Sequence, residues 1–230
     1  MTLEHVAFIM DGNRRYSKTF NFAKERGYKE GLEKMTEMMK LQVKYKLKET
    51  SFFALSSDNY GKRSSEELKI IFELVEKFCK NDRIISFLKE NKIKINIVGK
   101  IIEVEERFSL KKSLEHLKKI NEEIGEENFI VNIFVNYDGQ EEILDAINQI
   151  LKKGYDEVDD NILKRHMYYK GEPPQVIVRT GNAPRISGFM LWDSKYSEIY
   201  LTDKMWPQIC EKDFLDILDW YKNIKRNFGK

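Results

Sequence analysis

Short apolar runs alternate along the chain with longer segments in which apolar residues recur every three or four positions. The short runs predict β-strands, and the longer segments predict amphipathic α-helices. The predicted strands cover residues 5–10, 51–55, 93–98, 129–135, 175–178 and 198–201, and the predicted helices lie near residues 22–46, 65–90, 101–124, 139–153 and 211–227. This alternation is typical of an α/β fold with a mainly parallel sheet of about six strands and helices on both of its faces.

The predicted helix at 65–90 is apolar on two sides. Ser64 and Glu67 match the capping-box pattern that begins many helices. One apolar stripe contains Leu68, Ile71, Phe72 and Val75, and the other contains Ile70, Leu74 and Phe78. Such a helix has something to cover besides the sheet. Ordinary core is the simpler interpretation of this apolar surplus, and the lining of an apolar channel is the alternative.

Length and composition limit the class of protein. A chain of 230 residues, 41% of them hydrophobic, predicts one domain over residues 1–230 with a full core. The 40 Lys and Arg residues nearly cancel the 38 Asp and Glu residues, which argues against nucleic acid as a partner. Cys79 and Cys210 lack metal-ligand spacing, and neither a membrane-spanning stretch nor a signal peptide is evident. We therefore expect a cytoplasmic protein.

Polar residues follow four of the predicted strands at the point where each strand ends. They occupy residues 11–15, 56–60, 136–139 and 179–182. The carboxyl ends of parallel strands meet at one edge of a sheet, where ligands of α/β proteins bind. The sequence therefore predicts a binding site at this edge.

Asp11 follows an apolar run, so the strand should hold its carboxylate at this edge. Gly12 and Asn13 permit a tight turn whose backbone N–H groups can face an anion. A carboxylate and a bound anion repel each other unless a cation lies between them. Mg²⁺ is such a cation, because it binds one or two carboxylates together with substrate phosphates. The alternative is that Asp11 only caps the turn.

Arg179 and Arg185 flank a short Gly-Asn-Ala-Pro loop, and Ser187 follows. Two guanidinium groups and a hydroxyl suit a diphosphate, because Arg binds phosphate in a bidentate manner. Surface ion pairs are the alternative. His5, His116 and His166 share no ligand spacing, and we interpret them as structural or solvated.

The segment HVAFIMDGNRRYSK at residues 5–18 resembles the opening signature of the cis-prenyltransferases, the undecaprenyl diphosphate synthase family. ALSSDNYGKRSSEE at 54–67, NIFVNYDGQEEI at 132–143 and VIVRTGNAPRISGFMLWDSKYSEIYLTDKMWP at 176–207 are similar to the later motifs of that family. These segments occur in the family's order and cover nearly the whole chain.

The resemblance implies addition of isopentenyl diphosphate to an allylic prenyl diphosphate of the farnesyl or geranylgeranyl type, with new Z double bonds. It also implies dependence on Mg²⁺ and a homodimer. The expected product is a long polyprenyl diphosphate such as undecaprenyl diphosphate, and a short-chain product is the alternative. A lipid product leaves room for peripheral contact with a membrane.

The resemblance also implies residue roles. Asp11 matches the aspartate that binds Mg²⁺ and diphosphate, and Glu198 matches a second essential carboxylate that we expect at the metal. Asn59, like Ser56, matches a polar residue near the reacting carbons and is the second catalytic candidate after Asp11. The remaining substrate-binding candidates are Gly12, Asn13, Arg14 and Arg15 for the allylic diphosphate, Arg179, Arg185 and Ser187 for isopentenyl diphosphate, and Tyr16, Lys24, Tyr28, Tyr60 and Lys62 for either substrate.

Several positions depart from the commonest family pattern. These are Lys24 for arginine, Tyr28 for histidine, Tyr60 for tryptophan, Lys62-Arg63 for Arg-Pro, Ala183-Pro184 before Arg185, and Asn227 for an arginine near the end.

Three competing interpretations fit less well. A haloacid-dehalogenase-like phosphohydrolase needs a second aspartate two residues after the first, where this chain has Asn13. A trans-type prenyl synthase needs a DDxxD motif, which the pair Asp159-Asp160 does not begin. A noncatalytic subunit of the same fold would have lost Asp11 and its turn.

Overall fold

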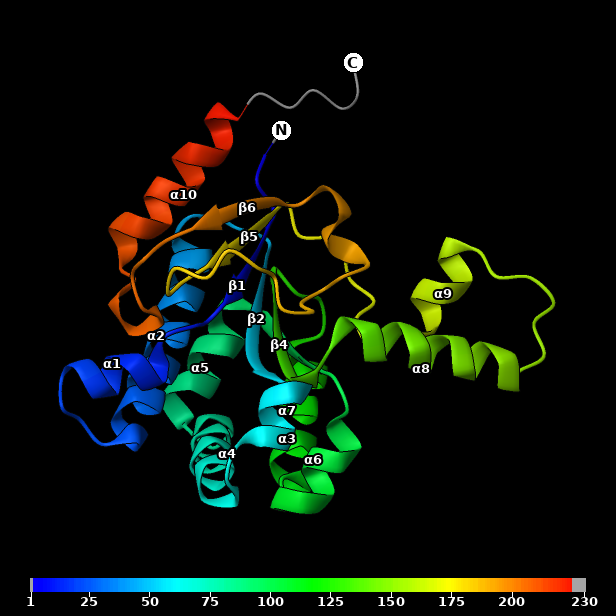
Figure 1. Cartoon of the computed structure of the whole chain (residues 1–230), viewed down its shortest axis with the longest axis horizontal. Helices are drawn as coiled ribbons and strands as arrows, with labels where there is room; N and C mark the ends of the chain where they lie inside the picture. The colour runs from blue at the N-terminus through cyan, green and yellow to red at the C-terminus, as the bar shows by residue number, and fades with distance from the viewer. Residues whose placement is uncertain (1, 225–230) are drawn as a thin grey trace.

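The computed structural model describes residues 2–224 and contains a six-stranded sheet with the strand order β3-β4-β2-β1-β5-β6 (Figure 1). Every neighbouring pair is parallel. The strands are β1 (His5–Ile9), β2 (Glu49–Ser56), β3 (Ile93–Val98), β4 (Phe129–Tyr137), β5 (Val176–Arg179) and β6 (Glu198–Leu201). The predicted α/β class and all six predicted strands are confirmed.

The five predicted helical segments are largely helical, but two of them are interrupted. The helices within residues 2–224 are α1 (Asn13–Thr19), α2 (Lys24–Lys44), α3 (Ser57–Lys62), α4 (Ser65–Cys79), α5 (Asp82–Asn91), α6 (Ile101–Phe108), α7 (Lys111–Ile124), α8 (Gly139–Lys152), α9 (Asp160–His166) and α10 (Glu211–Asn223). The short helices α1, α3 and α9 were not predicted. Continuous helices over 65–90 and 101–124 were wrong predictions. Asn81 ends the first run because its side chain accepts hydrogen bonds from the N–H groups of Arg83 and Ile84 and caps α5. Ser109 ends the second run in a left-handed conformation, with φ 56°.

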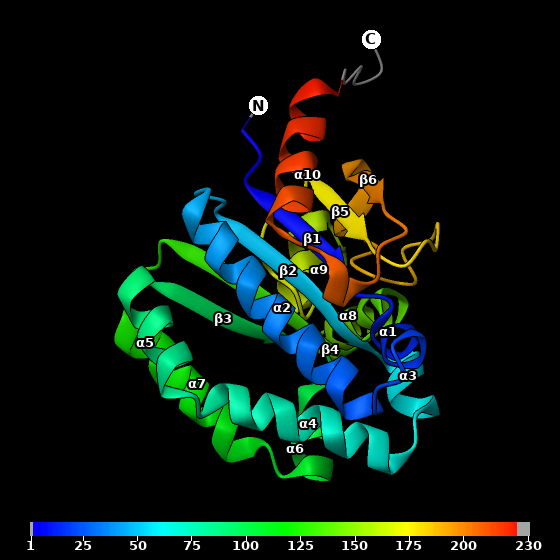
Figure 2. The ribbon, with the colours of Figure 1, turned by 90° about the vertical axis from the view of Figure 1, so that its left-hand side faces the viewer.

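Both faces of the sheet are buried, as the strand sequences predict for parallel strands. Val6 and Phe8 of β1 face one core, which α2, α4, α5 and α7 cover (Figure 2). Ala7 and Ile9 face a second core, which Phe189 and its neighbours cover from a loop. The helices α8 and α9 pack on each other and extend outward from the sheet (Figure 1).

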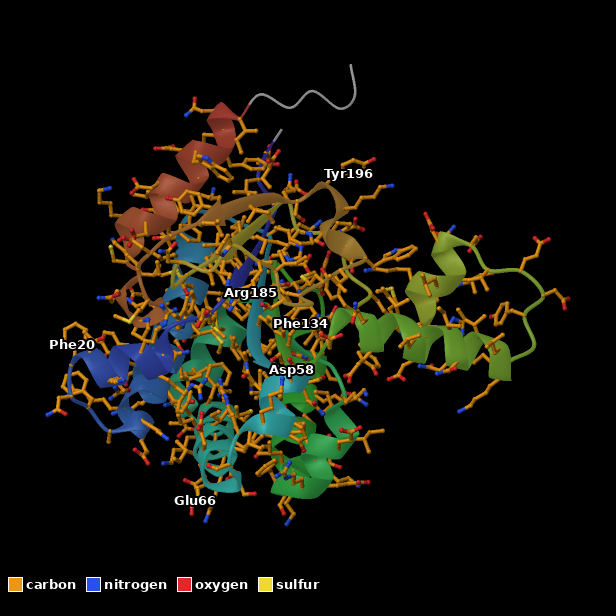
Figure 3. All side chains as sticks on the ribbon, viewed as in Figure 1. Phe20, Asp58, Glu66, Phe134, Arg185 and Tyr196 are labelled. Carbon is orange, nitrogen blue, oxygen red and sulfur yellow. The ribbon has the colours of Figure 1, made fainter. Side chains whose placement is uncertain are left out.

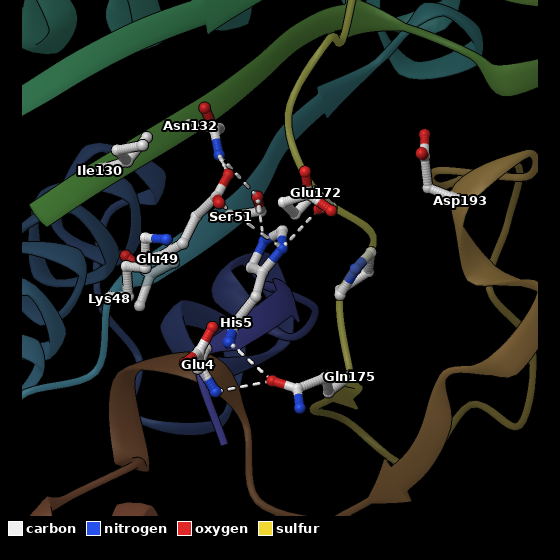
Figure 4. A network of polar contacts seen from close by, with 12 residues as sticks. Glu4, His5, Lys48, Glu49, Ser51, Ile130, Asn132, Glu172, Gln175 and Asp193 are labelled. Carbon is white, nitrogen blue, oxygen red and sulfur yellow. Dashed lines mark hydrogen bonds and ion pairs between the residues drawn. The ribbon is translucent and has the colours of Figure 1, made fainter. Parts of the chain in front are cut away.

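A buried polar network connects β1, β2 and β4 near the amino ends of these strands (Figure 4). His5 contacts the carbonyl of Glu172 through Nδ1 at 2.8 Å, so Nδ1 donates and Nε2 accepts from the Ser51 hydroxyl, also at 2.8 Å. Asn132 donates to Glu49 at 2.6 Å and to Ser51 at 3.1 Å. His5 is thus structural, as predicted, and burial lowers its pKa.

Within residues 2–224, no helix has both the length and the apolar character needed to span a bilayer.

Candidate active site

A cavity of about 740 Å³ opens at the carboxyl ends of the strands and continues between the sheet and the helices α2, α4 and α7. Its mouth is polar, and its interior is apolar. The polar lining comes from Asp11, Asn13, Arg14, Arg15, Tyr28, Ser56, Asp58, Asn59, Arg63, Asp138, Arg179, Arg185 and Ser187. The apolar lining includes Leu32, Met35, Phe72, Val75, Phe78, Leu114, Leu117, Ile133 and Val135. Asp58 and Arg185, labelled in Figure 3, mark two sides of this region.

The pairing of β1 with β5 brings Asp11 and Arg179 together, because Ile9 and Arg179 are partners in register. Arg179 is only 5% exposed, and it donates through Nη2 to Asp11 Oδ2 at 3.0 Å. Its Nη1 donates to the Ser187 hydroxyl at 2.7 Å and to the carbonyl of Arg185. Arg15 places Nη2 3.6 Å from Asp11 Oδ1. The structure thus gathers Asp11 and the predicted diphosphate residues at one edge.

Glycines allow α1 to approach its neighbours closely. Gly12 has φ 111°, and a Cβ there would lie 2.9 Å from the Cα of Met205. On α2, a Cβ at Gly31 would lie 2.4 Å from Oδ1 of Asn13, the first residue of α1. That Oδ1 is buried and has no hydrogen-bond partner in the part of the chain that the structure describes. The contacts that hold the turn after β1 in place therefore leave no room for a side chain at Gly12 or at Gly31.

The opposite side of the mouth is built from α2 and α4. The Tyr28 hydroxyl donates to the carboxylate of Glu67, and burial together with this bond raises the pKa of Tyr28 well above its ordinary value. Arg63 Nε and Arg14 Nη1 lie 3.4 Å and 3.9 Å from the same Glu67 oxygen. Ser56, which also lines the cavity, accepts a hydrogen bond from the N–H of Asn59 at 3.2 Å and caps α3.

Four predicted substrate residues are absent from the cavity lining within residues 2–224. Lys62 is 74% exposed and pairs with Asp58 at 3.1 Å. The other three are Tyr16, which packs against Phe20 and Phe22, Lys24, which begins α2, and Tyr60, whose ring packs against Phe72 and Phe108. Sequence reasoning missed Arg63, although the departure at Lys62-Arg63 was the available signal.

One chain does not bring Glu198 to Asp11. Glu198 opens β6 in register with Val176, which pairs with Val6 at the amino end of β1. Asp11 lies beyond the carboxyl end of β1. The two candidate metal carboxylates of a single chain therefore lie toward opposite ends of the sheet.

Among residues 2–224, no cluster of three His, Cys, Asp or Glu side chains is arranged to hold a metal ion. Asp11 nevertheless suits Mg²⁺ of the kind that is held by one carboxylate and by substrate phosphates, because it faces a cavity mouth rich in arginine. Asp11 therefore suits a Mg²⁺ ion that binds together with a diphosphate substrate. A Mg²⁺ site made of protein ligands alone would need more carboxylates than Asp11 provides.

Residues 9–229 match the sequence model of a family described as "Putative undecaprenyl diphosphate synthase". This chain belongs to the undecaprenyl diphosphate synthase family. It is 35% identical to a tritrans,polycis-undecaprenyl-diphosphate synthase (geranylgeranyl-diphosphate specific) of Thermoplasma volcanium, over 98% of this chain and 88% of the relative. It is 31% identical to an isoprenyl transferase of Fusobacterium nucleatum, over 98% of this chain and 95% of that relative.

A solved structure of a prenyl diphosphate synthase has the same fold as this chain. The crystal structure of lavandulyl diphosphate synthase from Lavandula x intermedia, in complex with dimethylallyl diphosphate, aligns with a TM-score of 0.90 at 25% identity and covers 100% of this chain and 99% of that chain. The resemblance found in the motifs is confirmed, and the chain is a prenyl-transferring enzyme. The phosphohydrolase alternative is excluded by this membership.

Proposed function

We propose that this chain, as one catalytic domain over residues 1–230, condenses isopentenyl diphosphate with an allylic prenyl diphosphate to form a polyprenyl diphosphate with Z double bonds. The observation that carries the proposal is the cavity itself. Its arginine-rich mouth around Asp11 suits diphosphates, and its apolar interior suits a growing isoprenoid chain. Geranylgeranyl diphosphate is the preferred primer in this proposal, since the Thermoplasma relative is named as specific for it.

The residues at the mouth divide between the two substrates. Arg179, Arg185 and Ser187 hold the diphosphate of isopentenyl diphosphate, and the turn at Gly12 with Arg14 and Arg15 holds that of the primer. Arginines placed in advance stabilise the negative charge that develops on a departing diphosphate. Asp11 would hold Mg²⁺, which supplies further neutralisation of the leaving group when bound.

The other polar and apolar residues then act on the carbon atoms. Ser56 fixes the start of α3 and so places Asn59 beside the cavity, where it faces the region in which the two carbon chains meet. The wall formed by α4 and by Ile133 excludes water from the allylic centre. Val131 of the same strand as Ile133 lies in the core, and Phe129 packs against that core.

The active form in this proposal is a homodimer, and exposed apolar side chains support it. Leu144, Ile147 and Leu151 lie on one side of α8, and Ile199 and Leu201 lie on the edge strand β6. Such groups are enriched at subunit interfaces. A second chain could also supply Glu198 to the Asp11 of its partner.

Trp206 is fully buried in its own chain and donates its indole N–H to the carbonyl of Gly31, so it offers no apolar surface to a second chain. The tail at 226–230, including Asn227, lies outside the described residues.

A cytoplasmic enzyme with a lipid product would meet the membrane through exposed apolar side chains. The loop after α1 supports this part of the proposal, because Phe20 is 46% exposed and stacks on Phe22, over which Arg26 lies at 3.5 Å. Aromatic and basic side chains together favour anionic bilayer surfaces.

We predict that the protein sediments together with anionic vesicles and that Phe20→Ser reduces the sedimented fraction severalfold, because it removes an exposed aromatic ring. Equal sedimented fractions for the two proteins would contradict membrane contact through this loop.

The central test is incubation of the purified chain with Mg²⁺, labelled isopentenyl diphosphate and either farnesyl or geranylgeranyl diphosphate. We expect labelled polyprenyl diphosphates whose chain length is read by chromatography, and their loss in excess chelator. Asp11→Ala should abolish turnover while the circular dichroism spectrum is retained. Release of inorganic phosphate without consumption of isopentenyl diphosphate, or near-normal turnover of the variant, would overturn the proposal.

A further inference from the structure

The chain turns at the end of α3 so that two consecutive basic residues take different environments. Lys62 is the last residue of α3, and Arg63 follows in an extended conformation, with φ −76° and ψ 149°. Lys62 is 74% exposed and pairs with Asp58. Arg63 is only 14% exposed and lines the cavity.

The surroundings of Arg63 do not balance its charge. Its Nε lies 3.4 Å from Glu67 Oε1, but Arg14 shares that oxygen, and the Tyr28 hydroxyl already donates to it. Two guanidinium groups therefore face one carboxylate. Asp11 also attracts Arg63, yet Asp11 already faces Arg15 and Arg179.

Two further observations indicate that a ligand completes this cluster. The buried Nε of Arg63 has no hydrogen-bond partner among the residues that the structure describes. A buried cation normally has both a counter-charge and acceptors for its N–H groups. The Tyr28 ring lies 5.4 Å from the guanidinium carbon of Arg63. Because Arg63 lines the cavity, a hydrogen-bond acceptor that enters the cavity can reach its guanidinium group.

We propose that Arg63, and not Lys62, binds the diphosphate of the allylic primer on the α4 side of the cavity mouth, together with Arg14. This inference rests on the proposed function, because the ligand class follows from the prenyl diphosphate substrates. The planar guanidinium gives two parallel hydrogen bonds to phosphate oxygens, which an ammonium group cannot do. Glu67 and Tyr28 act as positioning residues that hold Arg63 in this orientation.

The experiment compares Arg63→Gln with Lys62→Gln as a matched control, using steady-state kinetics with Mg²⁺. We expect Arg63→Gln to raise the KM for geranylgeranyl diphosphate about 10- to 100-fold, as loss of a charged hydrogen bond predicts, with a KM for isopentenyl diphosphate within about twofold of the original. Arg63→Lys should recover only part of the loss. Lys62→Gln should leave both constants nearly unchanged.

A double variant separates ligand binding from a structural role. If Arg63 only neutralises Glu67, then Glu67→Gln added to Arg63→Gln should restore the KM for the primer; if Arg63 binds diphosphate, the KM should stay raised. Calorimetric titration with inorganic diphosphate should show the same loss of affinity without any turnover. A restored KM, or a larger effect of Lys62→Gln, would overturn the inference. Product formation by the unaltered enzyme tests the proposed function separately.

Discussion

Arg179 shows how one side chain can serve both the fold and the candidate site. It ends a buried strand, and its guanidinium contacts Asp11, Ser187 and the carbonyl of Arg185. Its own Nε is buried without a partner within the described region. Removing Arg179 would loosen the Asp11 carboxylate as well as the proposed diphosphate contact, so Arg185 is the cleaner probe of the proposed isopentenyl diphosphate subsite.

We predict that Arg185→Ala raises the KM for isopentenyl diphosphate about tenfold or more and changes the KM for the primer by less than about twofold. Arg179→Ala should also lower kcat, because Asp11 then loses a hydrogen-bond donor at 3.0 Å. Steady-state kinetics with each substrate varied in turn provides the measurement. Equal changes in both KM values for Arg185→Ala would assign that residue another role.

His5 makes stability depend on pH. Its pKa in the folded protein lies below the ordinary value of 6.5 because burial disfavours the charged ring. The unfolded chain therefore binds more protons below pH 6.5, and this contribution to stability is lost as the pH falls from 6.5 toward the folded pKa. Burial raises the pKa of Glu142 and Asp193, whose effects have the opposite sign.

We predict that His5→Gln reduces the dependence of the protein's stability on pH. Urea unfolding midpoints measured between about pH 7 and 5.5 should fall less for the variant than for the unaltered protein, because the variant lacks a histidine that gains a proton on unfolding in this range. The variant should be less stable at pH 7, since the bonds to Ser51 and Glu172 are changed. Parallel curves for the two proteins would show that His5 does not titrate on unfolding.

Motif spacing was enough to place Asp11, Arg179 and Ser187 in one site, since parallel strands end at a common edge. Motif spacing could not show that Arg63 lines the cavity and that Lys62 does not. Which of two consecutive basic residues faces the cavity depends on the residue at which α3 ends, and a one-residue shift exchanges them. Nor could motif spacing show that the ring of Tyr60 packs against Phe72 and Phe108.

At the scale of elements, the packing of α1 against α2 decides where the turn after β1 lies. We predict that Gly31→Ala displaces Asn13 and lowers kcat/KM for the primer at least about tenfold, with a loss of about 1–3 kcal/mol in the free energy of unfolding. Gly61→Ala is the matched control, because a Cβ there meets no atom within 4 Å. Kinetics and urea unfolding of both variants check this, and similar losses in the two would contradict it.

The helix breaks show what periodicity cannot reveal. Apolar spacing runs through 65–90 with little interruption, yet the cap at Asn81 divides α4 from α5. The division has a functional consequence, since α4 lines the cavity and α5 does not, among the residues described. Both apolar stripes of α4 reach the cavity, with Ile71, Phe72 and Val75 from one stripe and Leu74 and Phe78 from the other, whereas Leu68 lies in the core.

At the scale of the whole molecule, the position of Glu198 links the proposed homodimer to the composition of the active site. If Glu198 serves the Asp11 of the partner subunit, Asp11→Asn and Glu198→Gln chains are each inactive as pure dimers. A mixed dimer then contains one site with both carboxylates intact. Random mixing should restore about a quarter of the original activity, since half of the dimers are mixed and each has one of two sites.

We expect this recovery when the two variants are coexpressed with different affinity tags, and the doubly purified mixed dimer should reach about half of the original activity. Leu144→Glu combined with Leu151→Glu should prevent both dimer formation in sedimentation experiments and the recovery, because each places a charge on the exposed apolar side of α8. If Glu198 instead serves its own chain, the mixed dimer contains no intact site and stays inactive. An active monomer at assay concentration would reject the dimer and this division of carboxylates together.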